Sequence, residues 1–344
     1  MSLALYRKYR PQNFDELVGQ DHIVQILKSA IQKGQIAHAY LFVGGRGVGK
    51  TSTARIFAKE LGVSNKDLYE LDAASNRKID DFRELADSVH SLPFESKYKI
   101  YIIDEVHMLT KEAFNAFLKT LEEPPEHVIF ILATTDFDKV PDTIKSRCQI
   151  LQFKLASKKS IKEALLNVAQ KENVQIGEDA LNLLAFAAAG SFRDALGLFQ
   201  KALAVSDSKV IKLQDVENSS HSAPLSSALD MLDALSDKGF ERAFEISQKL
   251  KETGANFKQF MELLAELLRT VILTRLSKQE EKRLQDEYTD ESFKILLKAS
   301  QSKHLNSKTL LTLLEKNEYL AFASDQSLIL DIFISELKEA EDKG

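Results

Sequence analysis

The most constraining feature of this sequence is a glycine-rich stretch that directly follows a short apolar run and precedes a helical pattern. It reads Gly44-Gly45-Arg46-Gly47-Val48-Gly49-Lys50-Thr51. The spacing fits G-x-x-x-x-G-K-[ST], in which glycines let the backbone turn tightly so that successive N–H groups converge on a phosphate. Lys50 would reach the β- and γ-phosphate oxygens, and the Thr51 hydroxyl would ligate Mg²⁺. The helix N-terminus adds a favourable dipole, so the pattern predicts a phosphate-binding loop.

A second apolar run, which ends in two carboxylates, predicts the other half of this site. Ile100–Ile103 is followed by Asp104 and Glu105. At the end of a strand, Asp104 could hold the Mg²⁺ shell and Glu105 could orient and activate the attacking water. Two acidic residues after a strand are by themselves common on solvated surfaces. The intact phosphate loop upstream favours the catalytic interpretation.

Short apolar runs alternate with helical patterns in the first part of the chain. The runs are Ala39–Val43, Leu68–Asp72, Ile100–Ile103 and Val128–Ala133. Their brevity and their β-branched or aromatic content suit strands buried on both faces of a parallel sheet. Between them, apolar residues recur with helical spacing over 54–61 and 114–121. The alternation predicts an α/β domain with a mostly parallel sheet.

Beyond Phe153 the strand patterns end and the chain reads as helical. Helices are expected over Ser157–Glu172, Gly177–Ala189 and Ser191–Ala204, and the polar stretch Glu217–Ser222 resembles a linker. From about Ala223 onward, leucine-rich stripes are typical of the core of a helical bundle. We therefore predict a nucleotide-binding domain over 1–156, a small helical lid domain over 157–217 and an all-α domain over 218–344.

Amino-acid composition limits the class of protein and the cellular compartment in which we expect it. Lys and Arg total 46 against 51 Asp and Glu, a net charge of −5, so DNA binding would have to rest on a local basic surface. No apolar run approaches the ~18 residues that a membrane helix needs, and the N-terminus turns basic too early for a signal peptide. We expect a cytoplasmic protein with no membrane partner.

Several short motifs occur in the order found in bacterial clamp loaders. They are Tyr6-Arg7-Lys8-Tyr9-Arg10-Pro11, Val18-Gly19-Gln20, the phosphate loop, Asp72-Ala73-Ala74-Ser75-Asn76, Asp104-Glu105-Val106-His107, Leu121-Glu122-Glu123-Pro124-Pro125 and Ser146-Arg147-Cys148. Together they resemble the gamma/tau subunits of the DNA polymerase III clamp loader, a family of AAA+ ATPases. The resemblance is strong over about residues 1–200, and the helical remainder agrees in length and character. Within AAA+ proteins, the Ser-Arg-Cys and Leu-Glu-Glu-Pro-Pro combinations are specific to clamp loaders.

The resemblance implies further roles around the nucleotide. Thr135 would be the sensor-1 residue that bonds the γ-phosphate or the lytic water. Arg147 would be an arginine finger for the ATP of a neighbouring subunit, and Arg193 would be sensor 2, which swings the second domain onto the nucleotide. Without the resemblance, Arg147 reads as an ordinary ion-pairing arginine and Arg193 as part of a solvated helix end. The implied nucleotide-binding residues are Tyr6, Arg7, Arg10, Pro11, Val18 and Gly19 around the adenine, and Gly45, Gly47, Val48, Gly49, Lys50, Thr51, Ser52 and Arg193.

The resemblance also implies an assembly that acts on DNA. This chain would be the ATP-driven motor subunit that opens the sliding clamp and loads it on primed DNA during replication. Its partners would be delta-like and delta-prime-like subunits, further copies of itself in a pentameric ring, the clamp and primer-template DNA, with the all-α domain as the oligomerising collar. Template phosphates would meet Asn76, Arg77, Lys78 and Arg83, for which a solvated charged face is the alternative.

Departures from the family pattern limit what carries over. Gamma/tau subunits usually carry a four-cysteine zinc module after the phosphate-loop helix, whereas here the interval is merely 60–67, without cysteine. Cys148 is the only cysteine, so we predict no zinc and expect a small buried apolar residue there. The sequence ends at Gly344 without the extension through which tau binds polymerase and helicase, so those partnerships are not expected.

The sequence leaves three alternative functions of the chain to weigh. An archaeal-type small subunit is opposed by Asp72-Ala73-Ala74-Ser75 and by Glu122-Glu123-Pro124-Pro125. A Holliday-junction helicase motor is opposed by Ser146-Arg147-Cys148. A non-hydrolysing structural subunit, like the delta-prime stator, would have no need of Lys50 and Thr51. Measurement of ATP turnover by the purified protein, with and without primed DNA and clamp, distinguishes these alternatives.

Overall fold

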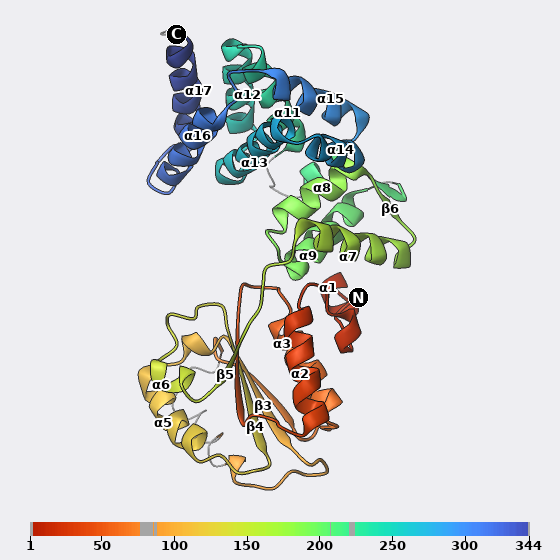
Figure 1. Ribbon diagram of the computed structural model, residues 1–344, viewed down its shortest axis with the longest axis vertical. Helices are drawn as coiled ribbons and strands as arrows, with labels where there is room; N and C mark the ends of the chain where they lie inside the picture. Colours follow the sequence, from red (N-terminus) through yellow and green to blue (C-terminus); the bar gives the residue numbers. More distant parts are fainter. Residues whose placement is uncertain (1–2, 76–84, 86–87, 207, 220–223, 343–344) are drawn as a thin grey trace. The chain divides into compact units, whose positions relative to one another are not determined.

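The computed structural model describes residues 3–75, 85, 88–206, 208–219 and 224–342, which fall into two compact units (Figure 1). Unit 1 comprises Met1–Ala164 and Gly190–Asp194, and unit 2 comprises Leu165–Ala189 and Ala195–Gly344. The predicted division into three domains stays a prediction. The candidate DNA-contacting residues Asn76, Arg77, Lys78 and Arg83 lie outside the described residues.

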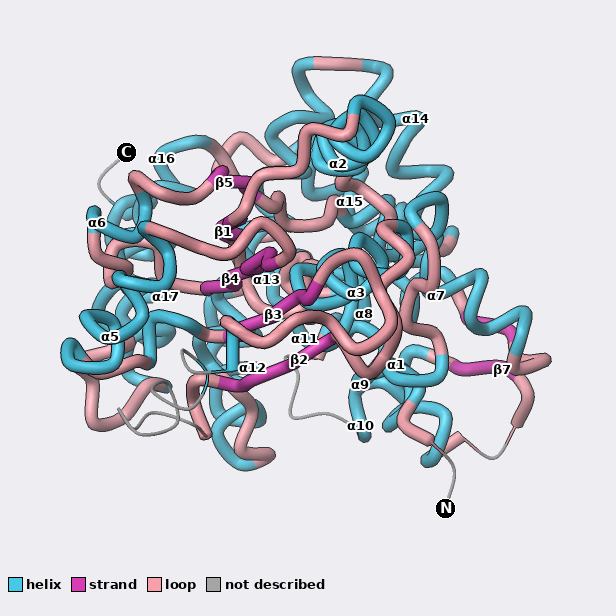
Figure 2. Tube along the Cα trace, turned by 90° about the horizontal axis from the view of Figure 1, so that it is seen from below, coloured by secondary structure: helices cyan, strands magenta, loops and turns pink. Residues whose placement is uncertain are grey.

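Unit 1 is built on a five-stranded parallel sheet with the order β2-β3-β4-β1-β5 (Figure 2). Its strands are β1 (Ala39–Val43), β2 (Leu68–Asp72), β3 (Lys99–Asp104), β4 (Val128–Thr134) and β5 (Gln149–Gln152). Because every pair is parallel, the carboxyl ends of all strands meet at one edge of the sheet. The predicted α/β domain with a mostly parallel sheet is confirmed.

Helices cover both faces of this sheet (Figure 1). The core on one face joins α2 (Asp21–Lys33) and α3 (Lys50–Glu60) to the strands, and the core on the other joins α5 (Lys111–Glu122) and α6 (Asp142–Lys145). Strands β1 and β4 are buried at every residue, as expected for strands covered on both faces. Strand β2 differs from that expectation, because it lies at the sheet edge and is only partly buried. Shorter elements of this unit are α1 (Leu5–Lys8), η1 (Phe14–Glu16) and η2 (Val106–Met108).

Unit 2 is mostly helical, with α13 packed against α11, α15 and α16. Two helices, α7 (Lys158–Lys171) and α9 (Phe192–Val205), begin in unit 1 and continue into unit 2. The other helices of unit 2 are α8 (Glu178–Ala187), α10 (Leu213–Ser219), α11 (Leu225–Ser236), α12 (Phe240–Glu252), α13 (Phe257–Leu276), α14 (Lys278–Glu287), α15 (Asp290–Gln301), α16 (Ser307–Tyr319) and α17 (Ser327–Asp342). Phe260, Leu264 and Leu268 on α13 are fully buried, which confirms the predicted helical bundle.

Two expectations for this region were wrong. Strands do occur after Phe153, since β6 (Gln175–Ile176) and β7 (Val210–Ile211) pair in parallel. Strands of two residues are too short to leave an alternating pattern in the sequence. The expected linker 217–222 also begins as helix, because α10 continues to Ser219. Within the described ranges, no helix is both long enough and apolar enough to cross a membrane.

A buried carboxylate fixes the start of β2 against the loop that leads into β3. Asp67 is 1% exposed and accepts hydrogen bonds from the backbone N–H groups of Phe94, Glu95 and Ser96 at 2.5, 3.0 and 2.8 Å. Burial by itself would raise the pKa of Asp67, but these hydrogen bonds outweigh it and lower the pKa to about 2. The ionised carboxylate therefore helps to hold β2 beside β3, the strand that carries Asp104.

We predict that Asp67→Ala lowers the free energy of unfolding by about 3 kcal/mol, because three backbone N–H groups lose their acceptor at on the order of 1 kcal/mol each. In the parent protein the stabilisation by Asp67 is present above its ordinary pKa of 3.8 and is lost as the pH falls through about 2. Urea unfolding at several pH values measures both effects. Asp67→Asn, which keeps one acceptor but does not titrate, should lose less stability and show a weaker acid dependence; equal stability of all three proteins would contradict the assignment.

Candidate nucleotide-binding site

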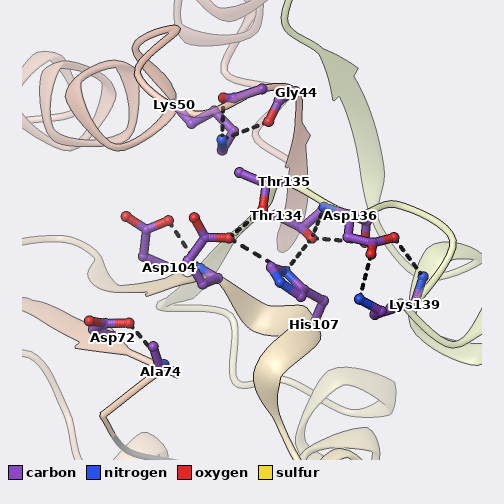
Figure 3. A network of polar contacts seen from close by, with 12 residues as sticks. Gly44, Lys50, Asp72, Ala74, Asp104, His107, Thr134, Thr135, Asp136 and Lys139 are labelled. Carbon is purple, nitrogen blue, oxygen red and sulfur yellow. Dashed lines mark hydrogen bonds and ion pairs between the residues drawn. The ribbon is translucent and has the colours of Figure 1, made fainter. Parts of the chain in front are cut away.

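The phosphate loop connects β1 to α3 and is anchored to the neighbouring strand, since the Gly44 N–H donates to the Thr134 carbonyl at 3.2 Å. Lys50 is 5% exposed, and its Nζ donates to the carbonyl oxygens of Gly44 and Gly45 at 2.7 and 2.8 Å (Figure 3). Burial lowers the pKa of Lys50, and the carboxylates of Asp104 and Glu105 oppose that shift. The loop thus surrounds one buried amine with carbonyl oxygens that a phosphate could replace. Val48 is buried beside it, and Ser52 lies in the first turn of α3.

The first residue pair of the site joins α3 to the end of β3. The Thr51 hydroxyl donates to Asp104 Oδ2 at 2.6 Å. A hydroxyl and a carboxylate are hard oxygen ligands of the kind that Mg²⁺ prefers. These two side chains therefore fit the magnesium site that the sequence predicted.

Glu105 follows β3 with a left-handed backbone, at φ 50° and ψ 44°. Its Oε2 accepts a hydrogen bond from the Thr135 hydroxyl at 2.8 Å, and Thr135 directly follows β4. Figure 3 shows Lys50, Asp104 and Thr135 gathered at this edge of the sheet. The structure thus brings together the candidate base and the candidate sensor-1 residue.

A segment from far along the chain reaches the phosphate loop. The Phe192 N–H donates to the Gly47 carbonyl at 3.1 Å, and a Cβ added to Gly47 would lie 2.0 Å from Ser191 Oγ. The Arg193 guanidinium carbon lies 5.0 Å from the centre of the Tyr6 ring. Gly190–Asp194 therefore packs in unit 1 beside the loop, and the candidate sensor 2 meets a candidate adenine-wall residue.

The N-terminal segment contributes clustered arginines around that contact. Arg7 lies 5.8 Å from the Tyr6 ring centre. Burial, followed by the charge of Arg55, lowers the pKa of Arg10, although Glu70 opposes the shift. Of the remaining adenine-wall candidates, Pro11 is half-buried, Val18 is exposed, and Gly19 forms a left-handed turn. This cluster offers positive charge and an aromatic face to a polyanionic ligand.

Arg147 makes its contacts elsewhere in unit 1. Its guanidinium pairs with Glu122 at 2.6 Å and donates to the Thr143 carbonyl at 2.8 Å. Both side chains of the ion pair are partly exposed. The neighbouring Cys148 packs against the core, and burial raises the pKa of its thiol to about 12. Arg147 is thus available at the surface, and Cys148 is a neutral thiol at physiological pH.

Sequence reasoning missed three residues of the site. His107 and Thr134 contact each other at 2.9 Å beside Glu105, and Ser191 touches the loop. The Asp-Glu-Val-His motif contained the signal for His107, although its spacing implied no contact. Ser191 lies in the segment predicted to carry sensor 2, but no local pattern signals its contact with the loop, because that contact joins residues far apart in the chain.

A phosphate loop after a central strand, carboxylates after β3 and a threonine after β4 define a nucleotide-binding protein of the AAA+ class. In agreement, the RuvB Holliday junction branch migration motor of Thermotoga maritima has the same fold. It superposes with a TM-score of 0.52 at 24% identity, over 61% of this chain and 72% of that one.

Sequence comparisons identify the family more narrowly. The family described as "DNA polymerase III, delta subunit" matches residues 19–77 and 63–157, and the family described as "DNA polymerase III clamp loader subunit, ATPase lid domain" matches 160–208. DNA polymerase III subunit gamma/tau of Mycoplasma pneumoniae is 41% identical over 76% of this chain and 41% of its own. DNA polymerase III subunit gamma of Buchnera aphidicola is 37% identical over 77% of this chain and 78% of its own.

The chain belongs to the gamma/tau family of DNA polymerase III clamp-loader subunits, which confirms the resemblance found in the sequence. The chain spans about half the length of several of these relatives. Three relatives that are 41%, 39% and 40% identical to it are covered over 41%, 56% and 46% of their own length, respectively.

We predict that Gly47→Ala weakens nucleotide binding about tenfold or more, because its Cβ would displace Ser191 and overpacking costs roughly 1–3 kcal/mol. Gly62→Ala is the matched control: its φ of +74° resembles the +71° of Gly47, but nothing lies within 4 Å of the added Cβ. Both variants carry the backbone strain, so only Gly47→Ala should lose affinity in a fluorescent-nucleotide titration. Equal affinities of the two variants would show that the contact with Ser191 is unimportant.

Proposed function

We propose that this chain is the ATP-hydrolysing motor subunit of a DNA polymerase III clamp loader. It would use ATP binding and hydrolysis to open the sliding clamp and load it on primed DNA in the cytoplasm. The observation that carries the proposal is the convergence of Lys50, the Thr51–Asp104 pair and the Glu105–Thr135 pair at one sheet edge, in a member of the gamma/tau family.

Binding would begin with an exchange of partners at Lys50. Its ammonium group now bonds two neutral carbonyl oxygens, and anionic phosphate oxygens would add a charge–charge attraction that those carbonyls lack. Mg²⁺, held by Thr51 and Asp104, would neutralise charge on the phosphates. Arg193 and Tyr6 would close over the nucleotide from the other side. We propose no zinc, because residues 60–67 contain no cysteine.

Hydrolysis would require a base and a sensor. Glu105 would take a proton from the attacking water, and Thr135 would hold the γ-phosphate or that water. Because the two side chains already share a hydrogen bond of 2.8 Å, both lie within reach of one reacting group. Glu105 and Thr135 would therefore act at the same step.

Arg147 would complete the site of a neighbouring subunit. Negative charge on the γ-phosphoryl oxygens must be stabilised in the transition state, and an inserted guanidinium is worth ~10³-fold or more in turnover. The ring would contain further copies of this chain with delta-like and delta-prime-like subunits, around primer-template DNA and the clamp. Arg77, Lys78 and Arg83 remain our candidates for contact with template phosphates.

We predict that Lys50→Ala weakens ATP binding about 100-fold or more, because the buried cation that faces the phosphates disappears. Glu105→Gln should bind ATP normally but turn it over at least about 100-fold more slowly, since an amide cannot act as the base. Equilibrium titration and steady-state ATPase assays with clamp and primed DNA measure both. If the parent protein binds ATP without turnover, the structural-subunit alternative is favoured instead.

Whether Arg147 acts on the ATP of a neighbouring subunit can be tested by mixing two defective subunits, Lys50→Ala and Arg147→Ala. Arg147→Ala should bind ATP nearly as the parent does, yet lose DNA-stimulated turnover in the assembled loader. If the finger acts on the neighbour, some mixed interfaces pair an intact loop with an intact arginine, so DNA-stimulated ATPase activity partly returns. No recovery in a verified mixed assembly would mean that Arg147 acts within its own chain or is only structural.

A further inference from the structure

His107 contacts Glu105, and the proposed function gives it no role. It lies in η2, two residues after Glu105, and its side chain is 10% exposed. Its Nδ1 is 2.9 Å from the Thr134 hydroxyl oxygen and 3.4 Å from Glu105 Oε2 (Figure 3). A nearly buried imidazole therefore stands between the end of β4 and the candidate base.

The contacts of Thr134 favour a hydrogen on Nδ1 of the His107 ring. The Thr134 hydroxyl donates to the Asp136 carbonyl at 3.0 Å, and its oxygen accepts from the Asp136 N–H at 3.0 Å. A hydroxyl has a single hydrogen, so it cannot also donate to the imidazole. With that hydrogen on the Asp136 carbonyl, we assign a hydrogen to His107 Nδ1, which donates it to Thr134. The same N–H is the group that faces Glu105 Oε2.

ATP would affect the two donors near Glu105, the Thr135 hydroxyl and the His107 N–H, in different ways. The Thr135 hydroxyl holds Oε2 at 2.8 Å, whereas the distance of 3.4 Å to His107 is longer than a direct hydrogen bond and makes that contact electrostatic. When Thr135 turns to the γ-phosphate or the lytic water, Oε2 loses its hydroxyl donor. The His107 N–H is fixed by Thr134, which the nucleotide does not contact in this scheme, so it stays in place.

We propose that His107 is a positioning residue for the catalytic base: its Nδ1–H, anchored on Thr134, keeps its electrostatic contact with Glu105 Oε2 when Thr135 engages the nucleotide. Glu105 Oε1 is then left to accept the proton of the attacking water. The left-handed backbone of Glu105 is uncommon outside glycine and asparagine, and such strained positions cluster at functional sites. This inference rests on the proposed role of Glu105.

The test compares His107→Leu, which removes the donor, with His107→Asn, whose amide keeps an N–H close to the position of Nδ1. In the assembled loader with clamp and primed DNA, His107→Leu should lower kcat about tenfold, because one orienting contact is lost. ATP affinity should stay within about twofold, and His107→Asn should recover most of the turnover. His127→Leu is the matched control, a half-buried histidine whose Nε2 contacts the Ser91 carbonyl at 3.1 Å, and it should turn over as the parent does.

A double variant separates positioning from a merely structural role. If His107 acts through the base, His107→Leu should have no further effect on kcat in a Glu105→Gln background. An equal loss in both backgrounds, or a loss of ATP affinity with no recovery in His107→Asn, would show a structural role and overturn the proposal. Unchanged kcat in His107→Leu, with turnover still lost in Glu105→Gln, would overturn this proposal alone. Normal turnover in Glu105→Gln would overturn the proposed mechanism and this proposal with it.

Discussion

The site depends on the parallel register of β1, β3 and β4. In that register Val43 pairs with Thr134 and Ile103 pairs with Leu132, so the three strands end within about one residue of each other. The loops that follow therefore deliver Lys50, Glu105 and Thr135 to one edge of the sheet. A slip of one residue would turn every side chain of a strand to the opposite face. Because β1 and β4 are buried at every residue, such a slip would empty both cores, and the hydrophobic packing thus fixes the geometry of the polar site.

The charged groups of the site differ in how firmly their own chain holds them. Lys50 is nearly buried, and the carboxylates of Glu105 and Asp104 compensate its desolvation only in part, as its lowered pKa indicates. A phosphate is a better partner for that amine, so part of the binding free energy is available before any movement of the chain. Arg147 is different, because its ion pair with Glu122 is partly exposed and such pairs contribute about 0–1 kcal/mol. Releasing Arg147 toward another subunit would therefore cost little, whereas displacing Lys50 from the loop without a replacement anion would cost much more.

Local patterns in the sequence predicted what lies at the strand ends, and they failed where distant segments meet. The phosphate loop and Asp104 could be placed because each follows an apolar run whose end a parallel sheet brings to one edge. The partial exposure of β2 was missed, since an apolar run such as Leu68–Asp72 does not reveal that its strand lies at the edge. The contact of Arg193 with Tyr6 was only implied by family resemblance, because the two residues are separated by most of unit 1. The contacts of His107 were missed for a related reason: β3 and β4 must first pair before η2 can meet Thr134.

At Gly47 the phosphate loop contacts a segment from much later in the chain, in addition to the nucleotide that it would bind. The loop touches Gly190–Asp194, a segment of unit 1 whose two ends continue into α8 and α9 of unit 2. Helix α8 is itself tied to later parts of unit 2, because Asp179 accepts hydrogen bonds from the Thr289 and Ser292 hydroxyls at 2.7 and 2.9 Å. A phosphate that moves the loop must move Ser191 as well, since no space separates Ser191 from Gly47. The absence of a Cβ at Gly47 is what lets this contact be so close.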